Sequence, residues 1–428
     1  MKVEKDGFKQ TEIGLIPKDW EVVRLGDVLS EVDIRVKHLT DIDPASLEVF
    51  SLTKEYGLIP QNQRFKKRIA VNDISNYKVV RKWQIVYNPY VIWEGAIHAL
   101  RTEKVVAVSP VYYVWECKNS NPSFIDRLLR TPKLLNEYLS RASGVVNRRR
   151  TVSKDDFLNI KIPLPPIEEQ RKIAKVLDTI QQAIELQDEI IKQTKNLKKS
   201  LMQKLFTEGL YGEEQKETEI GLIPKSWKVV RLGHDEILKK IQYGLSIKGK
   251  KEGKYPILRM NNLVDGLISI NDLQFVDLDE KTFRKFKLEK GDILFNRTNS
   301  YDLVGKTSIF HLDGDFVFAS YLIRLRLNNK IINPFFFNFY FNWDKTQFRL
   351  KGLASKGVSQ ANISATKLKS FILPLPPIEE QKQIVHILST VDRKIEIEQR
   401  RKEVLKKLFK IMLHKLMSGE IRLKEVEI

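Results

Sequence analysis

A segment that occurs twice in the chain constrains its fold more than any other feature. The motif Leu-Pro-Pro-Ile-Glu-Glu-Gln starts at Leu164 and again at Leu375, and each copy opens a long stretch without proline or glycine that runs to Gly209 or to Gly419. Proline suits the first turn of a helix because its φ is preset, and the glutamates that follow complement the positive end of the helix dipole. Glycine is a common helix stop. The two stretches are therefore predicted to be long helices.

Apolar side chains recur along both predicted helices in alternating steps of four and three residues, which is typical of a coiled-coil seam. The predicted seam residues are Ile173, Leu177, Ile180, Ile184, Ile191, Leu201 and Leu205 in the first helix and Ile384, Leu388, Val391, Ile395, Leu405, Phe409, Met412 and Leu416 in the second. A helix of about forty residues is a rod of roughly 60 Å, which cannot bury such a stripe alone. We expect the two helices to pack together as an antiparallel coiled coil. The alternative is an ordinary amphipathic helix in a bundle.

Polar residues interrupt the seam near the middle of both helices. This polar waist consists of Gln187, Thr194 and Lys198 in the first helix and Glu398 and Lys402 in the second. One interpretation is that these residues fix the register, because buried polar seam residues cost stability but specify alignment. The other is that the helices part here and a partner protein enters.

A second repeat precedes each globular block. The signature Thr-Glu-Ile-Gly-Leu-Ile-Pro-Lys occupies 11–18, followed by Trp20, and returns at 218–225, followed by Trp227. Each block mixes strand-like runs with short helical patterns, so the chain is a tandem duplication with an α+β fold. We expect two similar globular α/β domains related by a pseudo-two-fold axis and separated by the coiled coil. The predicted divisions are a first globular domain at 1–163, a first long helix at 164–209, a second globular domain at 210–374, a second long helix at 375–421 and a C-terminal tail at 422–428.

The charge balance indicates the class of partner. Of 428 residues, 74 are Lys or Arg and 54 are Asp or Glu, so the formal net charge is +20. Such an excess suggests a polyanion, most often nucleic acid; a lysine-rich surface without a ligand is the plainer interpretation. The single cysteine, Cys117, excludes an internal disulfide and a cysteine-based zinc site. No apolar run approaches the roughly 20 residues of a membrane span, and the N-terminus is too polar for a signal peptide. We expect a cytoplasmic protein with no membrane partner.

The doubled motifs carry a resemblance that covers essentially the whole chain. The arrangement resembles the specificity subunit of type I restriction-modification enzymes. The segment 290–297, with Gly305 and Lys306 after it, also looks like part of the target recognition domains of that family. In the first domain Lys82 and Trp83 replace the Gly-Asp pair of this segment, so its turn departs from the family pattern there.

The resemblance implies a non-catalytic subunit that binds double-stranded DNA. Each globular domain would read one half of a split target, and the paired helices would set the spacer. The subunit would dock two modification subunits, which methylate adenine with S-adenosylmethionine, and restriction subunits, which cut DNA with ATP. No cofactor is then expected in this chain, and S-adenosylmethionine, ATP and Mg are expected on the partner subunits.

Basic and amide residues gather in loops of both domains, and we predict these as DNA contacts. The candidates are Lys66, Lys67, Arg68, Arg148, Arg149 and Arg150 in the first domain and Asn296, Arg297, Asn299, Ser300, Lys356, Gln360 and Asn362 in the second. Arginine can clamp guanine or phosphate, and asparagine and glutamine can pair bidentately with adenine. Solvated loop charge without a ligand is the alternative.

The motifs of catalysis are not found in the sequence. An adenine methyltransferase needs a glycine-rich cofactor loop and an Asn/Asp-Pro-Pro-Tyr/Phe motif, which 88–90 and 333–336 approach without its second proline. There is no Walker A sequence for ATP, and the histidines show no metal-ligand spacing. We therefore predict no catalytic, cofactor-binding or metal-binding residues. Two other hypotheses stay open: a self-contained adenine-specific DNA methyltransferase, and a structural coiled-coil protein that binds DNA.

Overall fold

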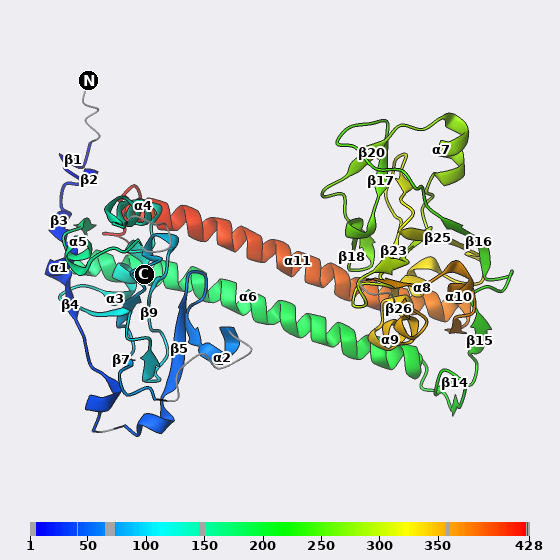
Figure 1. Cartoon of the computed structure of the whole chain (residues 1–428), viewed down its shortest axis with the longest axis horizontal. Coiled ribbons are helices and arrows are strands. Elements are labelled where there is room, and N and C mark those ends of the chain that lie inside the picture. The colour runs from blue at the N-terminus through cyan, green and yellow to red at the C-terminus, as the bar shows by residue number, and fades with distance from the viewer. Residues whose placement is uncertain are drawn as a thin grey trace. The chain divides into compact units, whose positions relative to one another are not determined.

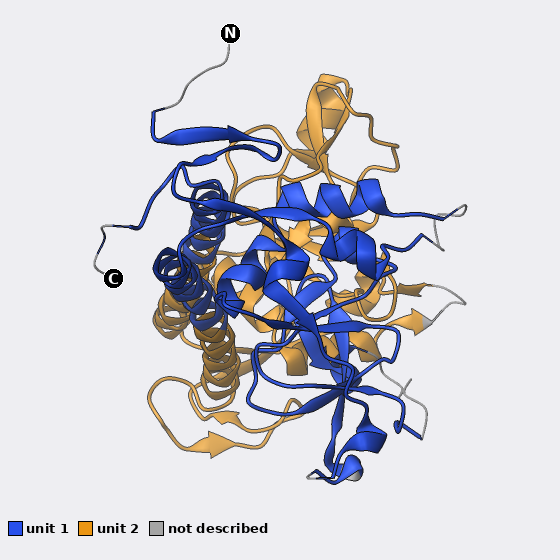
Figure 2. Cartoon of the chain, turned by 90° about the vertical axis from the view of Figure 1, so that its left-hand side faces the viewer, with its two compact units in different colours: residues 1–188, 401–428 blue, residues 189–400 orange. Residues whose placement is uncertain are grey.

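A computed structural model describes residues 6–40, 42–64, 73–144, 150–356, 360–424 and 426. The chain forms two compact units, which Figure 2 distinguishes by colour. Unit 1 comprises 1–188 and 401–428, and unit 2 comprises 189–400. The end of the chain therefore belongs to the same unit as its beginning.

Two long helices dominate the element order, as predicted (Figure 1). They are α6 (Ile167–Thr207) and α11 (Ile378–Met417), and each contributes one part to each unit. Just after each helix comes a glycine with a left-handed backbone, Gly209 (φ +69°) and Gly419 (φ +70°). A Cβ at Gly419 would overlap the ring of Pro17, so glycine is required there by space as well as by φ.

Every predicted seam residue of both helices is buried or half-buried. The helices run antiparallel within each unit. In unit 1, Lys402 of α11 pairs with Asp188 of α6. In unit 2, Lys198 Nζ of α6 lies 2.6 Å from Asp392 Oδ1 of α11. Two of the five waist residues thus pair with an acid on the facing helix, which supports the interpretation that the polar waist fixes register.

Unit 1 contains two four-stranded sheets. One has the order β4 (Leu29–Glu31), β11 (Tyr113–Cys117), β8 (Ile85–Tyr87), β9 (Ile97–Ala99). The other has the order β6 (Gly57–Pro60), β5 (Glu48–Thr53), β10 (Val106–Val108), β7 (Lys78–Val80), in which only β5 and β10 are parallel. Smaller pairs are β1 (Phe8–Thr11) with β2 (Gly14–Pro17) and β3 (Glu21–Arg24) with β12 (Lys161–Leu164). The longer helices of the block are α3 (Pro122–Leu128), α4 (Pro132–Arg141) and α5 (Lys154–Leu158).

Unit 2 repeats this order. Its main sheet runs β16 (Leu238–Tyr243), β25 (Leu322–Leu327), β21 (Ile293–Asn296), β23 (Thr307–Ile309), and a second runs β20 (Gln274–Val276), β17 (Tyr255–Leu258), β24 (Val317–Phe318). A three-stranded sheet of short strands runs β22 (Thr298–Asn299), β27 (Ala361–Asn362), β26 (Ser355–Lys356). The remaining pairs are β13 (Gln215–Lys216) with β14 (Ile223–Pro224), β15 (Lys228–Arg231) with β28 (Ile372–Leu375), and β18 (Leu263–Val264) with β19 (Leu267–Ile268). The helices are α7 (Glu280–Phe286), α8 (Pro334–Phe341), α9 (Asp344–Gly352) and α10 (Ala365–Lys369).

The two repeated motifs bind each other inside each unit. The fully buried indole of Trp20 donates to Glu169 Oε2 at 3.0 Å, and that of Trp227 donates to Glu380 Oε2 at 2.8 Å. Both glutamates of each pair lie in the first helical turn, as predicted, and the second of each pair is in addition buried and accepts a long-range hydrogen bond.

The adjacent glutamine of the helix motif holds the start of a block helix. Gln170 Oε1 accepts from the backbone N–H of Asn121, which caps α3, and Gln381 Oε1 accepts from that of Asn333, which caps α8. The motif therefore joins the long helix to the globular block in the same way twice.

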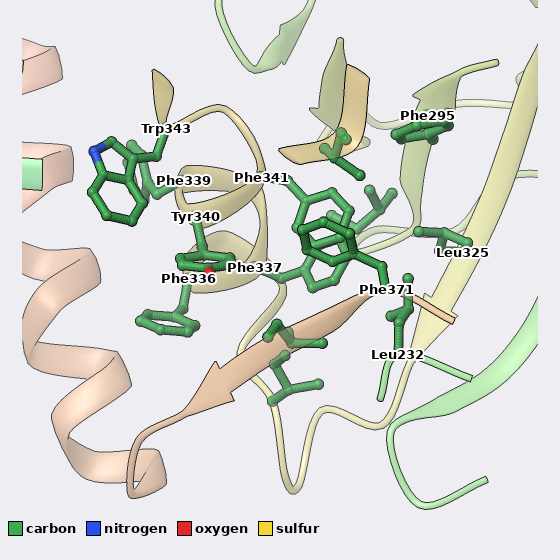
Figure 3. Packing of buried hydrophobic residues seen from close by; sticks show 14 of the residues in the cluster. Leu232, Phe295, Leu325, Phe336, Phe337, Phe339, Tyr340, Phe341, Trp343 and Phe371 are labelled. Carbon is green, nitrogen blue, oxygen red and sulfur yellow. The ribbon is translucent and has the colours of Figure 1, made fainter. Parts of the chain in front are cut away.

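The core of unit 2 is aromatic (Figure 3). Phe337 and Phe341 of α8 stack with ring centroids 3.9 Å apart, and Phe206 of α6 meets the edge of Phe336 at 5.7 Å. Burial of such a side chain contributes roughly 1.5–3 kcal/mol. This packing fixes the globular block of unit 2 against the part of α6 that belongs to the same unit. The loops of the block therefore have a rigid support.

Candidate nucleic-acid interface

The predicted DNA contacts fall into three groups in the structure. Lys66, Lys67, Arg68, Arg148 and Arg149 lie outside the described residues. Arg150, Asn296 and Arg297 are engaged in contacts within the protein. Asn299, Ser300, Lys356, Gln360 and Asn362 come together around one small sheet of unit 2.

Arg150 makes contacts within the protein. Its guanidinium donates from Nη2 to the carbonyl oxygens of Ala142 at 2.8 Å and Leu139 at 3.2 Å, at the end of α4. A cation at this end of a helix satisfies orphan carbonyls and complements the dipole. These contacts give Arg150 a role in the fold, and its contact with DNA stays a prediction.

Asn296 and Arg297 also make contacts within the protein. Asn296 has no exposed surface, and its Nδ2 donates to the carbonyl oxygen of Leu303 at 3.3 Å. The half-buried Arg297 donates from Nη1 to the carbonyl oxygen of Ser320 at 3.3 Å and lies 4.8 Å from the ring centroid of Tyr243. Both side chains hold the loop that follows β21, and neither projects freely into solvent.

The other candidates of unit 2 are neighbours in the sheet β22-β27-β26. Thr298 and Asn299 pair with Asn362 and Ala361, and Lys356 pairs with Ala361 from the other side. Asn362 Nδ2 donates to Thr298 Oγ1 at 3.0 Å. Two sequence segments that are far apart thus form one polar surface, to which Ser300 and Gln360 add exposed side chains.

A cavity of about 800 Å³ adjoins this surface. Its walls come from four segments: the loop after β16, the stretch from β17 to β20, the stretch from β21 to β23, and the turn between β24 and β25. The polar and aromatic residues of these walls that the sequence analysis missed are Lys248, Arg259, Asn261, Gln274, Lys306 and Tyr321. The lysine- and glycine-rich run 246–254 is a further signal in the sequence that points to this place.

The polar wall residues differ in how far the protein already satisfies them. Arg259 donates from Nη2 to Asp272 Oδ2 at 3.0 Å, and Asn261 donates to the same carboxylate oxygen at 2.8 Å. Lys248 and Lys306 are exposed, and neither forms an ion pair with any residue that the structure describes. The cavity therefore carries uncompensated positive charge.

The loop after β21 has a counterpart in unit 1. The N–H of Asn296 donates to the carbonyl oxygen of Lys306 at 2.8 Å, and that of Ile363 donates to Arg297 at 2.9 Å. In unit 1 the N–H of Asn88 donates to the carbonyl oxygen of Ala96 at 3.0 Å, and the N–H of Val152 donates to the carbonyl oxygen of Pro89 at 3.3 Å. The same backbone frame therefore supports a loop in both units.

The side chains on the two frames differ. The unit 1 loop carries an exposed Tyr90, a half-buried Trp93 and Glu94, whose carboxylate lies 3.7 Å from Lys54 Nζ. The unit 2 loop carries hydroxyl and amide groups in Thr298, Asn299 and Ser300. The same backbone frame therefore carries different side chains in the two units, which fits two binding surfaces that prefer different ligands.

Two titratable side chains have strongly shifted pKa values. Burial raises the pKa of the Cys117 thiol to about 12, so the thiolate is disfavoured. Burial, together with the cation of Arg130, lowers the pKa of His98 to about 4, so this imidazole is neutral at physiological pH. Within the described ranges, no three His, Cys, Asp or Glu side chains gather as metal ligands, and no described helix is both long and apolar enough to span a membrane.

Comparison with known proteins identifies the family. The profile of the "Type I restriction modification DNA specificity domain" matches 17–196 and 224–407. The putative type I restriction enzyme MjaX specificity subunit of Methanocaldococcus jannaschii is 30% identical over 98% of both chains. The MjaVIII specificity subunit of the same organism is 26% identical over 99% of this chain and 98% of its own.

Solved structures agree on the fold. A chain from a study of complex assembly and conformational transition in the type I R-M system has a TM-score of 0.57 at 20% identity, covering 95% of this chain and 99% of its own. The type I restriction-modification S subunit of M. genitalium has a TM-score of 0.56 at 16% identity, covering 97% and 98%. With one domain profile matched in each half and a relative matched along the whole length, the chain belongs to the family of type I restriction-modification DNA specificity subunits.

Proposed function

We propose that this specificity subunit recognises a split DNA target, with each globular domain reading one part. The observation that carries the proposal is the duplicated loop frame after β8 and β21, which bears Tyr90, Trp93 and Glu94 in unit 1 and Thr298, Asn299 and Ser300 in unit 2. Base edges are distinguished by the hydrogen-bonding and apolar groups that meet them. Two loops of different chemistry on one frame therefore fit two different half-sites.

We propose that α6 and α11 set the spacer between the half-sites. With 41 residues, α6 is about 60 Å long, which exceeds the roughly 34 Å of one turn of B-DNA. The buried seam and the ion pairs Lys402–Asp188 and Lys198–Asp392 resist sliding of one helix along the other. A pair of helices in fixed register is a suitable ruler.

The outer face of α11 is the proposed docking surface for the modification subunits. Within unit 1 it exposes Val404 (64%), Leu408 (42%) and Ile411 (53%), again in steps of four and three residues. Such a stripe fits an apolar helix of a partner. The exposed Lys407 and Lys410 beside it favour a partner helix with acidic flanks.

The modification and restriction subunits are the proposed carriers of the chemistry. Two modification subunits would hold S-adenosylmethionine, and restriction subunits would use ATP and Mg, so this chain needs no cofactor of its own. The competing hypothesis is a self-contained adenine methyltransferase. Titration calorimetry of the purified chain with S-adenosylmethionine separates the two, because stoichiometric binding would support the competing hypothesis.

The main test is to map the modified bases. The chain is assembled with its cognate modification subunit, a DNA library is methylated, and modified adenines are located by sequencing. We expect a target in two parts with a fixed unspecified spacer. A continuous target, or methylation without sequence preference, contradicts the proposed function.

A further inference from the structure

The cavity of unit 2 combines features that sequence alone did not bring together. We propose that it is the DNA-gripping site of the second domain, in which Lys248 and Lys306 bind backbone phosphates and Asn299 reads a base edge. This inference rests on the proposed function and adds the roles of individual residues to it.

The charge of the cavity selects an anion. Three of its wall residues are basic, namely Lys248, Arg259 and Lys306, and none of its wall residues in the described part of the chain is acidic. Asp272 compensates Arg259 from outside the wall, whereas the two lysines have no such partner among the described residues. Lysines bind phosphates as mobile point charges, and this contact carries affinity but no sequence information.

Asn299 is positioned for a different task. Its Oδ1 accepts from the N–H of Ser300 at 2.8 Å, which fixes the side chain, and its Nδ2 faces the Met260 sulfur at 3.2 Å. A thioether is a weak acceptor. An oxygen or nitrogen acceptor on a base edge forms a stronger hydrogen bond than this sulfur does. The Asn299 amide would therefore gain hydrogen-bond energy by donating to DNA instead of to Met260.

A second observation points to a polar ligand. The Asn296 side chain forms part of the cavity wall, and its buried Oδ1 has no hydrogen-bond partner. Buried polar atoms are normally paired, so an orphaned acceptor in a cavity wall indicates a polar group that belongs nearby.

The rim supplies apolar contacts as well. Ile247, Val264, Leu303 and Tyr321 all line the cavity and remain exposed. Exposed apolar groups that gather around a concave polar surface mark a binding site. Against DNA, such groups meet thymine methyls and sugars. The cavity thus combines two lysines for phosphates, the fixed Asn299 amide for a base edge and an apolar rim for sugars and thymine methyls. Duplex DNA presents all of these groups.

The test separates the two kinds of contact by their salt dependence. The complete chain with its modification subunit is titrated with the mapped target and with an unrelated duplex over a series of KCl concentrations. We expect Lys248→Met and Lys306→Met each to lower the slope of log K against log[KCl] by about 0.9 on both duplexes. Asn299→Ala leaves the slope unchanged and reduces the preference for the target roughly 10-fold, through one half-site only.

Matched controls exist in the same unit. Asn329 and Lys330 are exposed and follow β25, whereas Tyr321 precedes it, so a strand of six residues, roughly 20 Å long, separates them from the cavity. Asn329→Ala and Lys330→Met should behave like the unsubstituted chain. If Asn299→Ala lowers the melting temperature, Asn299→Ser is used, because its hydroxyl can still accept from Ser300.

The outcomes distinguish this inference from the proposed function. If Lys248→Met, Lys306→Met and the Asn299 variant all behave like the controls while the unsubstituted chain still prefers a split target, the cavity assignment is overturned and the proposed function stands. If the unsubstituted chain shows no split target, the proposed function fails and the inference fails with it.

Discussion

Two neighbouring glutamates at the start of α11 show how differently adjacent residues can act. The side chain of Glu379 is 72% exposed and lies 2.7 Å from Lys382 Nζ, one turn along the helix. Glu380 is 2% exposed and accepts from Trp227 Nε1 at 2.8 Å and from the N–H of Leu210 at 2.9 Å. The motif alone predicted the same role for both, because the partner that separates them lies 153 residues earlier in the chain.

Replacement of Glu380 should destabilise unit 2, whereas replacement of its neighbour should not. Glu380→Ala leaves two buried N–H donors without an acceptor, each at a cost of about 1–3 kcal/mol, so we expect a loss of roughly 2–4 kcal/mol. Glu379→Ala is the matched control, with an expected change below about 0.5 kcal/mol. Urea unfolding followed by tryptophan fluorescence measures both. Equal effects of the two substitutions would contradict the assigned role.

Arg422 makes the stability of unit 1 depend on pH. Burial alone would raise the pKa of Glu169, but the hydrogen bonds from Arg422 and Trp20 outweigh it and hold this pKa below its usual value. Such a carboxylate stabilises the fold above its unfolded pKa of about 4.3, and the stabilisation is lost as the pH falls. Arg422→Met should therefore lower the free energy of unfolding by about 1.5–3 kcal/mol at neutral pH.

The difference between Arg422→Met and the unsubstituted chain should shrink as the pH falls from about 4.3 through the lowered pKa of Glu169, because the carboxylate then becomes protonated in the unsubstituted chain as well. Lys424→Met is the control. Lys424 is exposed, and its Nζ lies 3.6 Å from Asp19 Oδ2. Exposed pairs of this kind contribute at most about 1 kcal/mol to stability. Urea titrations at several pH values provide the measurement. A difference that stays constant with pH would exclude the carboxylate as its source.

The residue scale also marks the limit of prediction from sequence. Arg150 and Arg297 look like DNA contacts in the sequence because both lie in basic, polar loops. In the structure Arg150 donates to a carbonyl oxygen at the end of α4, and Arg297 donates to a carbonyl oxygen of a neighbouring loop. The direction of each guanidinium therefore depends on neighbours in the tertiary structure. Lys248 and Lys306 were missed for the complementary reason: they become neighbours of Asn299 only when the sheet forms.

At the scale of elements, the long helices were predictable because their signal is local. Proline, the glutamates, the four-three apolar spacing and the final glycine all act within a few residues of one another. The short strands β22, β26 and β27 carry no such signal, since each has two residues and β22 pairs with β27 from far away in the sequence. Helix α11 carries in addition a second stripe of apolar residues that faces away from the seam.

A charge on the outer stripe should block docking and leave the fold intact. Leu408 is 42% exposed, so Leu408→Glu has little folding cost, but it would place a carboxylate in an apolar helix interface. We expect co-purification with the modification subunit to weaken by roughly 30-fold or more, the effect of losing a hot-spot residue. Gln399→Glu, at an exposed position of the same helix outside the stripe, is the control that adds the same charge. Retained co-purification of the Leu408 variant would reject this docking surface.

A paired insertion tests the ruler directly. Seven residues added between Asp188 and Glu189 of α6, and seven between Arg400 and Arg401 of α11, preserve the contacts within each unit and lengthen both helices by about 10 Å. At about 3.4 Å per base pair, the spacer of the target should grow by roughly three base pairs. An insertion in α6 alone shifts the seam against its partner and should reduce activity sharply. An unchanged spacer after the paired insertion would refute the ruler.

At the scale of the whole molecule, the duplication was visible in the sequence although most of the block residues differ. The repeated motifs fix the ends of each block through Trp20 with Glu169 and Trp227 with Glu380. The interiors differ in their residues: Arg101 and Arg130 each lie 2.8 Å from the buried Asp126 in unit 1, whereas Arg326 Nε lies 2.8 Å from the buried Asp292 in unit 2. A conserved frame with an exchangeable interior suggests modular specificity.

Exchange of a block tests this modularity. Replacement of 27–163 by the same region of another specificity subunit keeps both repeated motifs and both long helices. We expect only one half-site of the target to change, because the loop frame of unit 2 is untouched. Methylated-base mapping of the chimera against the parent provides the measurement. A change in both half-sites would show that the domains do not read independently.

The return of the last residues to unit 1 has a consequence for biosynthesis. Leu416, Met417 and Leu423 are buried in the same core as Trp20 and Leu25, and Arg422 neutralises the buried Glu169 of that unit. A ribosome makes all of 189–400 before it makes these residues, so the first domain to emerge is the last to close its core. Until then its open end exposes apolar surface. Nascent chains that stall before residue 416 should therefore depend on chaperones, and those released there should be targets for proteolysis.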